Sequence, residues 1–212
     1  MKKHGGVAGA GAGGPNGGII SNKQAHSGAR SWWIGSTNGI YHIVNPPLQT
    51  ATVFVFLYDN AEEASVNAQV IGCTSETTEV AGWPIGAGSW MYMGICTTGP
   101  ECKGYYFRSA DKGEICVGDK RETGWHLLAY VIDQGKLSAY ADGEKMEDCK
   151  MTQLGNLVIF HAWAADQFLK EGGFVDDIFI FSDKRDPTKD PTLAVEPNSK
   201  LTATWGHIKG LH

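Results

Sequence analysis

The sequence lacks any apolar run near the ~18 residues that a membrane-spanning helix needs, so a transmembrane helix is excluded. Charge is scarce as well, since 19% of the residues are Asp, Glu, Lys or Arg, against about 25% in an average soluble domain. Acidic residues outnumber basic ones by 23 to 18, and the formal net charge is −5. A protein held on nucleic acid by positive charge is therefore excluded.

No two cysteines form a C-x-x-C pair, the spacing that zinc ribbons and thioredoxin-type redox sites use. Cys96 and Cys102 flank the turn sequence TTGPE, so a disulfide between them could close that loop. Free buried cysteines are also common as small core residues. Because the chain has 5 cysteines, at least one thiol stays unpaired.

The carboxylate pattern of a sandwich glycosidase is also missing. Such enzymes hold two carboxylates about 5–5.5 Å apart for retention or about 6.5–9.5 Å apart for inversion, which on one strand face would read Glu-x-Asp-x-(x)-Glu. Asp176 and Asp177 are adjacent, and alternation predicts that their side chains point to opposite faces. The remaining acidic groups suit turns or solvated positions: Glu62, Glu63, Glu144, Glu147 and Asp148. A G-x-S-x-G nucleophile elbow is absent too.

Glycine is abundant, with 28 residues, about twice the usual ~7% share. Many of them lie between positions 5 and 18, where the Leu/Val/Phe-rich core of a secretory signal is absent. We predict that residues 1–18 form a flexible Gly-rich lead-in.

Short runs rich in Val, Ile and aromatic residues follow, and turn residues separate most of them. This spacing predicts an all-β fold of two antiparallel sheets, a sandwich or jelly roll. The predicted strands cover 29–34, 39–44, 51–58, 65–71, 89–95, 104–109, 125–133, 136–142, 156–163 and 174–181.

The clearest hairpin is WHLLAYVID-QG-KLSAYAD, in which Gln134-Gly135 forms a two-residue turn with a positive φ at Gly135. Asp142-Gly143 forms the next turn. Alternation places Leu137, Ala139 and Ala141 on one face, and Ser138, Tyr140 and Asp142 on a wetter one.

Three proline residues and many charges follow Phe181, which indicates a surface wrap without a core of its own. Leu201, Trp205 and Ile208 then recur at helical spacing and predict a short C-terminal helix or turn. The expected organisation is a lead-in (1–18), a β-sandwich (19–183) and a C-terminal wrap with a short helix (184–212).

Three segments resemble the laminin-G-like, concanavalin A-like lectin-glucanase jelly rolls of bacterial secreted proteins. They are AHSGARSWWI at 25–34, GWHLLAYVIDQGKLSAYADGEK at 124–145, and GGFVDDIFIFSD at 172–183. The middle segment is the most specific, and Arg121 precedes its Gly-Trp-His as in bacterial members. The resemblance covers about residues 18–183. It implies two antiparallel sheets, often with a structural calcium ion and a glycan or protein ligand.

Aromatic residues make the case for binding, because Trp and Tyr offer flat apolar faces that stack on sugar C–H surfaces and polar edges that orient them. The Gly-rich loop WPIGAGSW between Trp83 and Trp90 is a plausible binding rim. Most of the 7 Trp nevertheless suit the core, Trp125 and Trp205 above all. The predicted ligand-binding residues are Trp83, Trp90, Tyr92, Tyr106, Arg108, His126, His161 and Trp163, with Tyr105 also considered.

Asp176 or Asp177, at the start of the last strand, is the best calcium candidate, and Asp59 with Asn60 could contribute. Calcium takes six to eight oxygens, many of them backbone carbonyls, so few carboxylates need be visible in the sequence. These acids equally suit solvated strand ends or pairing with Arg.

We therefore expect a non-catalytic carbohydrate-binding or adhesion module of an extracellular or cell-surface protein. Its partner would be a polysaccharide or glycan, or another surface protein. Two alternatives stay open: a polysaccharide lyase or glycoside hydrolase that uses the concave sheet with Tyr, His and Arg, and a structural protein-association module. Fold alone does not choose between them.

Overall fold

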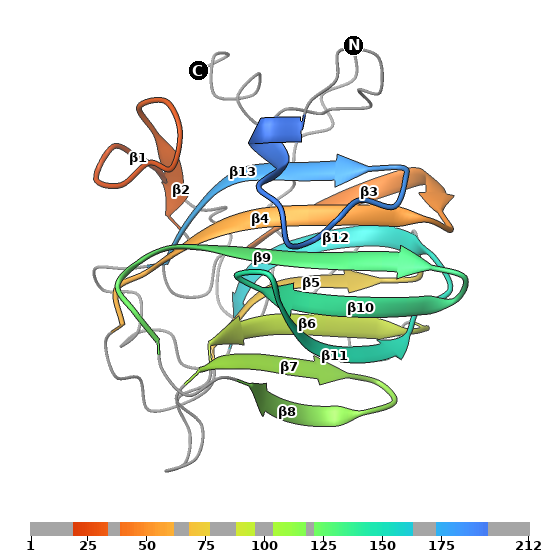
Figure 1. The fold of residues 1–212 in the computed structure, drawn as a ribbon. Coiled ribbons are helices and arrows are strands. Elements are labelled where there is room, and N and C mark those ends of the chain that lie inside the picture. The colour runs from red at the N-terminus through yellow and green to blue at the C-terminus, as the bar shows by residue number, and fades with distance from the viewer. Residues whose placement is uncertain are drawn as a thin grey trace.

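The structure, a computed structural model, describes residues 19–33, 39–61, 68–76, 88–95, 104–117, 121–162 and 173–194. They form two antiparallel sheets packed face to face (Figure 1). In spatial order the seven-stranded sheet is β1 (Ile19–Ser21), β2 (Ser31–Trp33), β13 (Phe174–Phe181), β4 (Ala51–Asp59), β9 (Gly124–Asp133), β10 (Lys136–Ala141) and β11 (Glu144–Lys150). The six-stranded sheet is β3 (Gly39–Leu48), β12 (Leu154–Ala162), β5 (Ala68–Thr74), β6 (Trp90–Ile95), β7 (Tyr105–Ser109) and β8 (Gly113–Val117).

The strand order confirms the predicted two-sheet antiparallel jelly-roll sandwich. The last strand, β13, lies between β2 and β4, so the two ends of the sandwich meet in one sheet. Short turns join β9 to β10, β10 to β11 and β7 to β8, and β6 pairs with β7 as its antiparallel neighbour. The predicted C-terminal helix at Leu201, Trp205 and Ile208 lies outside the described residues.

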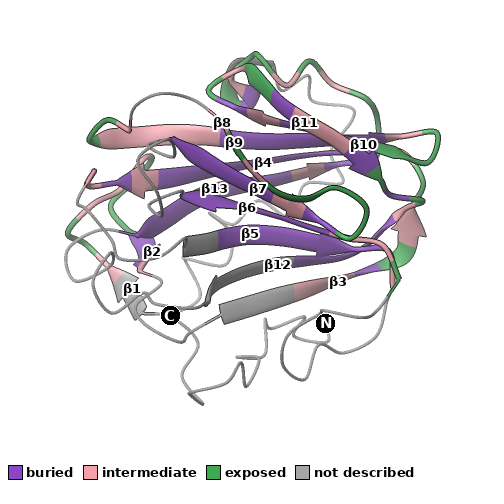
Figure 2. Ribbon diagram, turned by 90° about the horizontal axis from the view of Figure 1, so that it is seen from below, coloured by how far each residue is buried: buried purple, intermediate pink, exposed green. Residues whose placement is uncertain are grey.

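The main core fills the space between the sheets. From the seven-stranded sheet, Val53, Val55 and Leu57 of β4 and Leu128 of β9 point inward, and each is fully buried. The facing layer comes from β5, β6 and β7, whose core members include Ile71, Cys73, Met91, Met93 and Phe107. Figure 2 shows that the central strands of both sheets are buried along most of their length.

A second apolar cluster covers the outer side of the seven-stranded sheet. Phe54 and Phe56 alternate with the core residues of β4, and Phe179 and Phe181 of β13 lie beside them. Trp125 packs against this cluster, as the sequence predicted for that residue. Because both faces of β4 are covered, its sequence ATVFVFLYD is nearly all apolar rather than alternating.

The hairpin turns follow the prediction. Gln134 and Gly135 have φ values of 51° and 80°, and Asp142 and Gly143 have 48° and 81°. Two successive positive φ values define the type I′ turns that match the twist of paired strands. Leu137, Ala139 and Ala141 are buried as the alternation predicts, while Ser138 and Tyr140 on the other face are half-buried.

Three strands that the sequence pattern did not predict lie at sheet edges: β1, β8 and β11. Glu144, Glu147 and Asp148, which were predicted to be solvated residues beyond the hairpin, belong to β11. Charged residues suit an exposed edge because they discourage pairing with another chain, and they also remove the hydrophobic signal of a strand.

A wrap follows β13 and crosses the outer side of the seven-stranded sheet. Its first residues are tied to β4 by the buried hydroxyl of Thr52, which donates to the carbonyl of Asp183 (2.8 Å) and accepts from the backbone N–H of Arg185 (2.9 Å). A short 3-10 turn, η1 (Pro191–Ala194), ends the described part. In the parts of the chain that the structure covers, no helix has the length and apolar character needed to cross a bilayer.

Replacing Thr52 by the isosteric Val should weaken the attachment of the wrap to the sheet. Two buried hydrogen bonds are lost, and we expect the free energy of unfolding to fall by about 1–3 kcal/mol. Urea unfolding of Thr52→Val measures the loss, with Thr123→Val as control, because Thr123 is exposed and makes one hydrogen bond. Equal stability of the two variants would contradict this role.

Candidate functional site

Four of the predicted ligand-binding residues lie together on the outer face of the six-stranded sheet. Trp90 and Tyr92 are two residues apart on β6, so they share a face, and Arg108 of β7 pairs directly with Tyr92. Tyr106 shares that face of β7, whereas the intervening Phe107 points into the core. We call Trp90, Tyr92, Tyr106 and Arg108 the aromatic face.

Packing within the aromatic face determines which of its side chains are exposed to solvent. The rings of Trp90 and Tyr92 lie 5.1 Å apart at an interplanar angle of 31°. The Arg108 guanidinium carbon sits 5.9 Å from the centre of the Trp90 ring, within cation–π range. Tyr92 and Tyr106 are buried, whereas Trp90 and Arg108 are half-buried. Contact with a ligand therefore falls to Trp90 and Arg108, with Tyr92 as support.

A glycine on the neighbouring strand makes room for the Tyr92 ring. Gly72 of β5 pairs with Tyr92 across the ladder. A methyl group at Gly72 would overlap the Tyr92 ring and come within 2.9 Å of the Met91 carbonyl oxygen. Glycine in a strand interior marks close approach of this kind.

His126 lies elsewhere, at an end of the sandwich. Its partner on β4 is Leu57, a core residue, so His126 is on the inner side of the seven-stranded sheet and away from the aromatic face. Its Nδ1 lies 2.7 Å from a carboxylate oxygen of Asp142, and its Nε2 lies 2.8 Å from the backbone carbonyl oxygen of Glu122. Both partners are acceptors, so both ring nitrogens donate only when the imidazole is protonated.

The same contacts govern the titration of His126. Partial burial acts to lower the pKa of the imidazole, but the hydrogen bonds to Asp142 and to the Glu122 carbonyl outweigh it, and the pKa is raised above its ordinary value. These contacts favour the protonated form of His126 at the end of the sandwich.

The prediction that the side chains of Asp176 and Asp177 point to opposite faces of the sheet is wrong. The pairing of β13 with β4 shifts between Asp176 and Phe179, and Asp177 has a φ of 43°. This bulge turns both carboxylates toward one segment: Asp176 accepts from the backbone N–H of His26 (3.0 Å), and Asp177 contacts the His26 ring (2.8 Å). Ser27 adds a hydroxyl hydrogen bond to Asp177 (2.7 Å).

The two aspartates hold His26 in place, a residue that the sequence pattern did not single out. Its ring stacks on Phe56 with a centroid distance of 3.6 Å and meets the edge of Trp125 at 5.6 Å. The paired aspartates thus tie the segment before β2 down over the second apolar cluster. No periodicity marks such a histidine, because its partners lie about 150 residues away.

Asp59, the third predicted metal ligand, forms a buried ion pair. Arg121 donates to both of its carboxylate oxygens, from Nε at 2.8 Å and from Nη2 at 2.6 Å. The side chains of Asp59 and Arg121 are 0% and 7% exposed, and the Ala61 backbone N–H also donates to Asp59. Among the residues that the structure describes, no group of three or more His, Cys, Asp or Glu is placed to hold a metal ion.

Some predictions fall outside what the structure describes. Trp83 and Trp163 lie in undescribed segments, as do Cys96 and Cys102, and for His161 only the backbone, in β12, is described. Cys116 is disulfide-bonded, whereas Cys73 and Cys149 are free and buried. Burial raises the pKa of the Cys149 thiol to about 12 and that of Cys73 well above its usual range, so both thiols stay protonated and unreactive.

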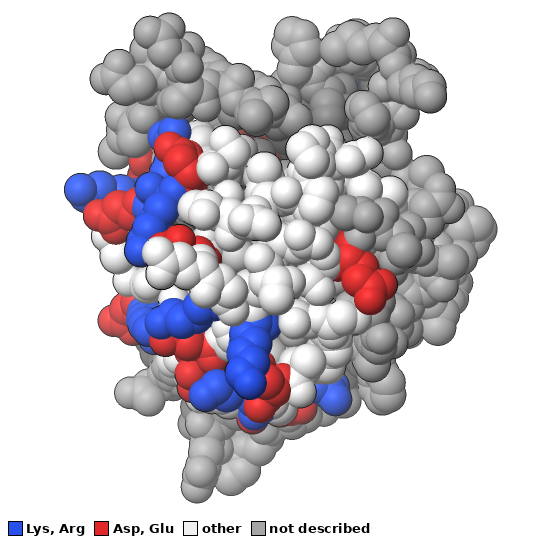
Figure 3. All heavy atoms as spheres, turned by 90° about the vertical axis from the view of Figure 1, so that its right-hand side faces the viewer, with Lys and Arg blue, Asp and Glu red and all other residues white. Residues whose placement is uncertain are grey.

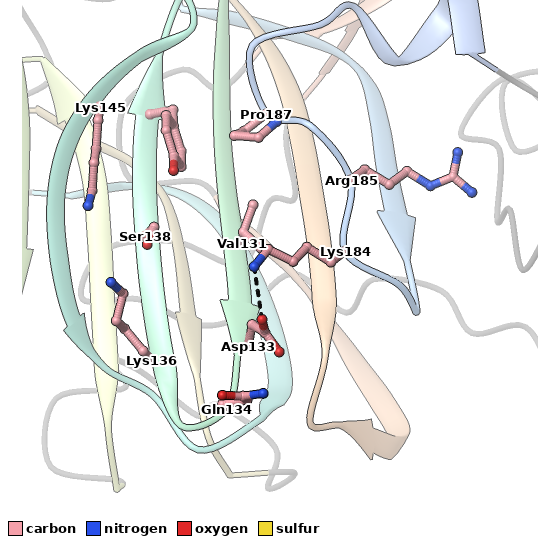
Figure 4. A pocket seen from close by; sticks show the side chains of 10 residues that line it. Val131, Asp133, Gln134, Lys136, Ser138, Lys145, Lys184, Arg185 and Pro187 are labelled. Carbon is pink, nitrogen blue, oxygen red and sulfur yellow. Dashed lines mark hydrogen bonds and ion pairs between the residues drawn. The ribbon is translucent and has the colours of Figure 1, made fainter.

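A groove that the sequence reasoning did not find lies on the opposite side of the molecule (Figure 4). It encloses about 460 Å³ over the outer face of β9 and β10, and the wrap forms one wall. The only sequence signal was the placement of Ser138 and Tyr140 on the wetter face of the hairpin. Its lining comprises Val131, Asp133, Gln134, Lys136, Ser138, Tyr140, Lys145, Lys184, Arg185 and Pro187.

Solved structures of other proteins share this fold. No family model and no curated protein sequence matches the chain. Domain 4 of AbnA, an extracellular GH43 arabinanase from Geobacillus stearothermophilus solved with arabinotriose, aligns over 90% of this chain and 88% of its own, with a TM-score of 0.55 and 14% identity. The binding domain of botulinum neurotoxin DC, solved with SialylT, aligns over 81% of this chain and 42% of its own, with a TM-score of 0.51 and 10% identity.

A further botulinum neurotoxin binding domain, of serotype D/C, covers 83% of this chain and 45% of its own, with a TM-score of 0.50 and 10% identity. At such identities the likeness concerns the fold alone. The chain is a concanavalin A-like jelly-roll sandwich, as the three resembling segments implied.

The protonated His126 predicts a pH dependence of stability. Because its pKa is raised in the folded protein, its contribution is fully present below the unfolded pKa of about 6.5 and is lost as pH rises through the folded value. His126→Gln should lower the free energy of unfolding by about 1–3 kcal/mol at pH 5.5, with the difference shrinking toward pH 9. Urea unfolding across this range measures it, and a difference that does not change with pH would refute the charged state.

Proposed function

We propose that this chain is a non-catalytic carbohydrate-binding or adhesion module of an extracellular protein, and that it binds glycan through the aromatic face. One observation carries the proposal: Trp90 and Arg108, adjacent and half-buried, are held in place by the buried Tyr92 on the outer side of the six-stranded sheet.

The chemistry of this pair suits a sugar. An indole face stacks on the C–H surface of a pyranose or furanose ring, and a guanidinium donates hydrogen bonds to hydroxyl oxygens at its edge. The Tyr92 ring packs against the Trp90 indole, with 5.1 Å between the ring centres, and this contact restricts the side-chain freedom that Trp90 would lose on binding. Such preorganisation favours affinity.

The solved neighbours and the cysteines support the same reading. Two neighbours were solved with arabinotriose and with SialylT, and the arabinanase is extracellular. The disulfide at Cys116 suits an oxidising compartment, because cytosolic proteins keep their thiols reduced. Membership of the laminin-G-like family is part of the proposal and rests on the three resembling segments.

Replacing Trp90 by Ala should abolish stacking and weaken glycan binding at least about tenfold, or ~1.4 kcal/mol. A glycan array identifies a ligand for the unmodified protein, and calorimetry compares the variants. Trp33→Ala is the matched control, because Trp33 is also half-buried but lies in the other sheet. Circular dichroism must show both variants folded.

Other results would favour the alternatives. Equal binding by Trp90→Ala and the unmodified protein would remove the aromatic face from the proposal. Appearance of unsaturated uronic ends from an acidic polysaccharide would show a lyase. Binding to no glycan, together with capture of a surface protein, would favour a protein-association module.

We further propose a structural calcium ion, with Asp176 and Asp177 as the main carboxylates and Asp59 as a lesser candidate. The bulge brings the first two together, although both are engaged with His26 and Ser27. Calcium at 2 mM should then raise the melting temperature by several degrees, and Asp177→Asn should abolish the rise. An unchanged melting temperature in calcium and in EDTA would refute the ion.

A further inference from the structure

The groove on the seven-stranded sheet has a floor set by strand register. Val131, Ser138 and Asp148 lie directly opposite one another across β9, β10 and β11, and Tyr140 lies opposite Lys145 in the adjacent row. Side chains that share a row on one face are the closest cross-strand neighbours. The floor is therefore a compact set of polar groups beside one aromatic ring.

A bulge in β11 brings a second lysine into this set. The pairing of β10 with β11 shifts between Ala139 and Tyr140, and Met146 turns into the core. Lys145 and Asp148 are three residues apart and would face opposite sides of a regular strand. Because of the bulge they share the outer face, where the Lys145 Nζ lies 2.7 Å from Asp148 Oδ2.

Two lysines share this one carboxylate. The Lys136 Nζ lies 2.9 Å from the same Oδ2, and the Ser138 hydroxyl donates to Oδ1 at 2.6 Å. Partial burial acts to raise the pKa of Asp148, but the hydrogen bonds from Lys145, Ser138 and Lys136 hold it well below its usual range. In Figure 4 the side chains of Lys136 and Lys145 point toward each other, and Ser138 lies beside the space between their amino groups.

Basic side chains outnumber acidic ones in the groove lining, which holds Lys136, Lys145, Lys184 and Arg185 against Asp133. Lys136 and Lys145 share the Asp148 carboxylate as hydrogen-bond partner, and the Glu147 carboxylate is a further negative charge near Lys145. Each ammonium keeps N–H donors beyond its bond to Asp148. Their side chains are 57% and 48% exposed, so these donors are open to solvent. Figure 3 shows Lys and Arg side chains interspersed with Asp and Glu side chains along one side of the molecule, beside a broad area without charged residues.

The wrap supplies the opposite wall. Lys184 crosses toward Asp133, to which it donates at 3.0 Å, and Pro187 lies above the groove (Figure 4). Thr52 anchors one end of this wall to β4. At its other end Thr188 approaches the turn at Gly143, where a Cβ would lie 3.4 Å from Thr188. The wall is hydrogen-bonded to β4 at one end and packs close to the Gly143 turn at the other, so these contacts shape the groove without a ligand.

We propose that this groove is a second binding site, for the carboxylate or sulfate group of an acidic saccharide. The oxyanion lies between the Lys136 and Lys145 ammonium groups, and the sugar ring packs against the half-buried Tyr140. A volume of about 460 Å³ falls within the ~300–1,000 Å³ of small-molecule sites. The choice of a saccharide over a free ion rests on the proposed function, whereas the site and its charge do not.

The experiment is calorimetric titration, at low ionic strength, of the whole chain with a heparin hexasaccharide, trigalacturonate, neutral maltotriose and sodium sulfate. The test variant is Lys136→Gln with Lys145→Gln. Its control is Lys23→Gln with Lys112→Gln, which removes the same charge from exposed positions elsewhere. We expect the test variant to lose about tenfold or more in affinity for the acidic oligosaccharides, and the control less than about threefold.

The ligand series identifies the anion. Binding of the heparin fragment alone assigns sulfate, of trigalacturonate alone carboxylate, and of both a shared oxyanion site. Equal losses in the test and control variants, no binding of either acidic oligosaccharide, equal binding of maltotriose, or sulfate binding as tight as that of the hexasaccharide would each overturn the proposal.

Trp90→Ala separates this site from the aromatic face. It should leave binding of the acidic oligosaccharides within about twofold, because Trp90 lies in the other sheet. Loss of acidic-oligosaccharide binding in Trp90→Ala would place that ligand on the aromatic face and overturn the groove. Conversely, a failed aromatic face with an intact lysine effect would leave the groove standing.

Discussion

The alternation of side chains along β4 and β9 is the constraint on which the rest of the molecule depends. These strands pair without a register shift from Ala51–Ile132 to Asp59–Gly124. Each strand therefore sends every second side chain between the sheets and the others outward. The inward set builds the main core, and the outward set, with Phe54 and Phe56, carries the cluster that the wrap and the His26 segment cover.

The sequence predicted the central strands and the hairpin because these carry strong local signals. Gln134-Gly135 suits a type I′ turn, and Leu137, Ala139 and Ala141 mark a buried face. The strands β8 and β11 were missed because GEICV and EKMEDCK owe their structure to a neighbour rather than to their own pattern. Pairing with β7 or β10 is a tertiary effect that propensity does not register.

The sites were only partly predictable, and two bulges explain much of the difference. Trp90, Tyr92, Tyr106 and Arg108 meet on one face because β6 and β7 alternate regularly. Asp177 and Lys145 follow irregular pairing, which reverses the face that alternation assigns. The site of His126 could not be predicted for a different reason. The residue lies at the end of the sandwich, beyond the packed core, because of the register between β9 and β4, and the sequence of its own strand does not reveal that register.

The buried pair of Asp59 and Arg121 restricts how this chain can evolve. Loss of either partner leaves the other as an unpaired buried charge, which lowers the free energy of unfolding by about 3–5 kcal/mol. The whole free energy of unfolding of a domain is roughly 5–15 kcal/mol. Replacement of both by apolar side chains of similar volume is often neutral. Descendants of this sequence should therefore keep both residues or exchange both together, so the two positions vary as one unit although 62 residues separate them.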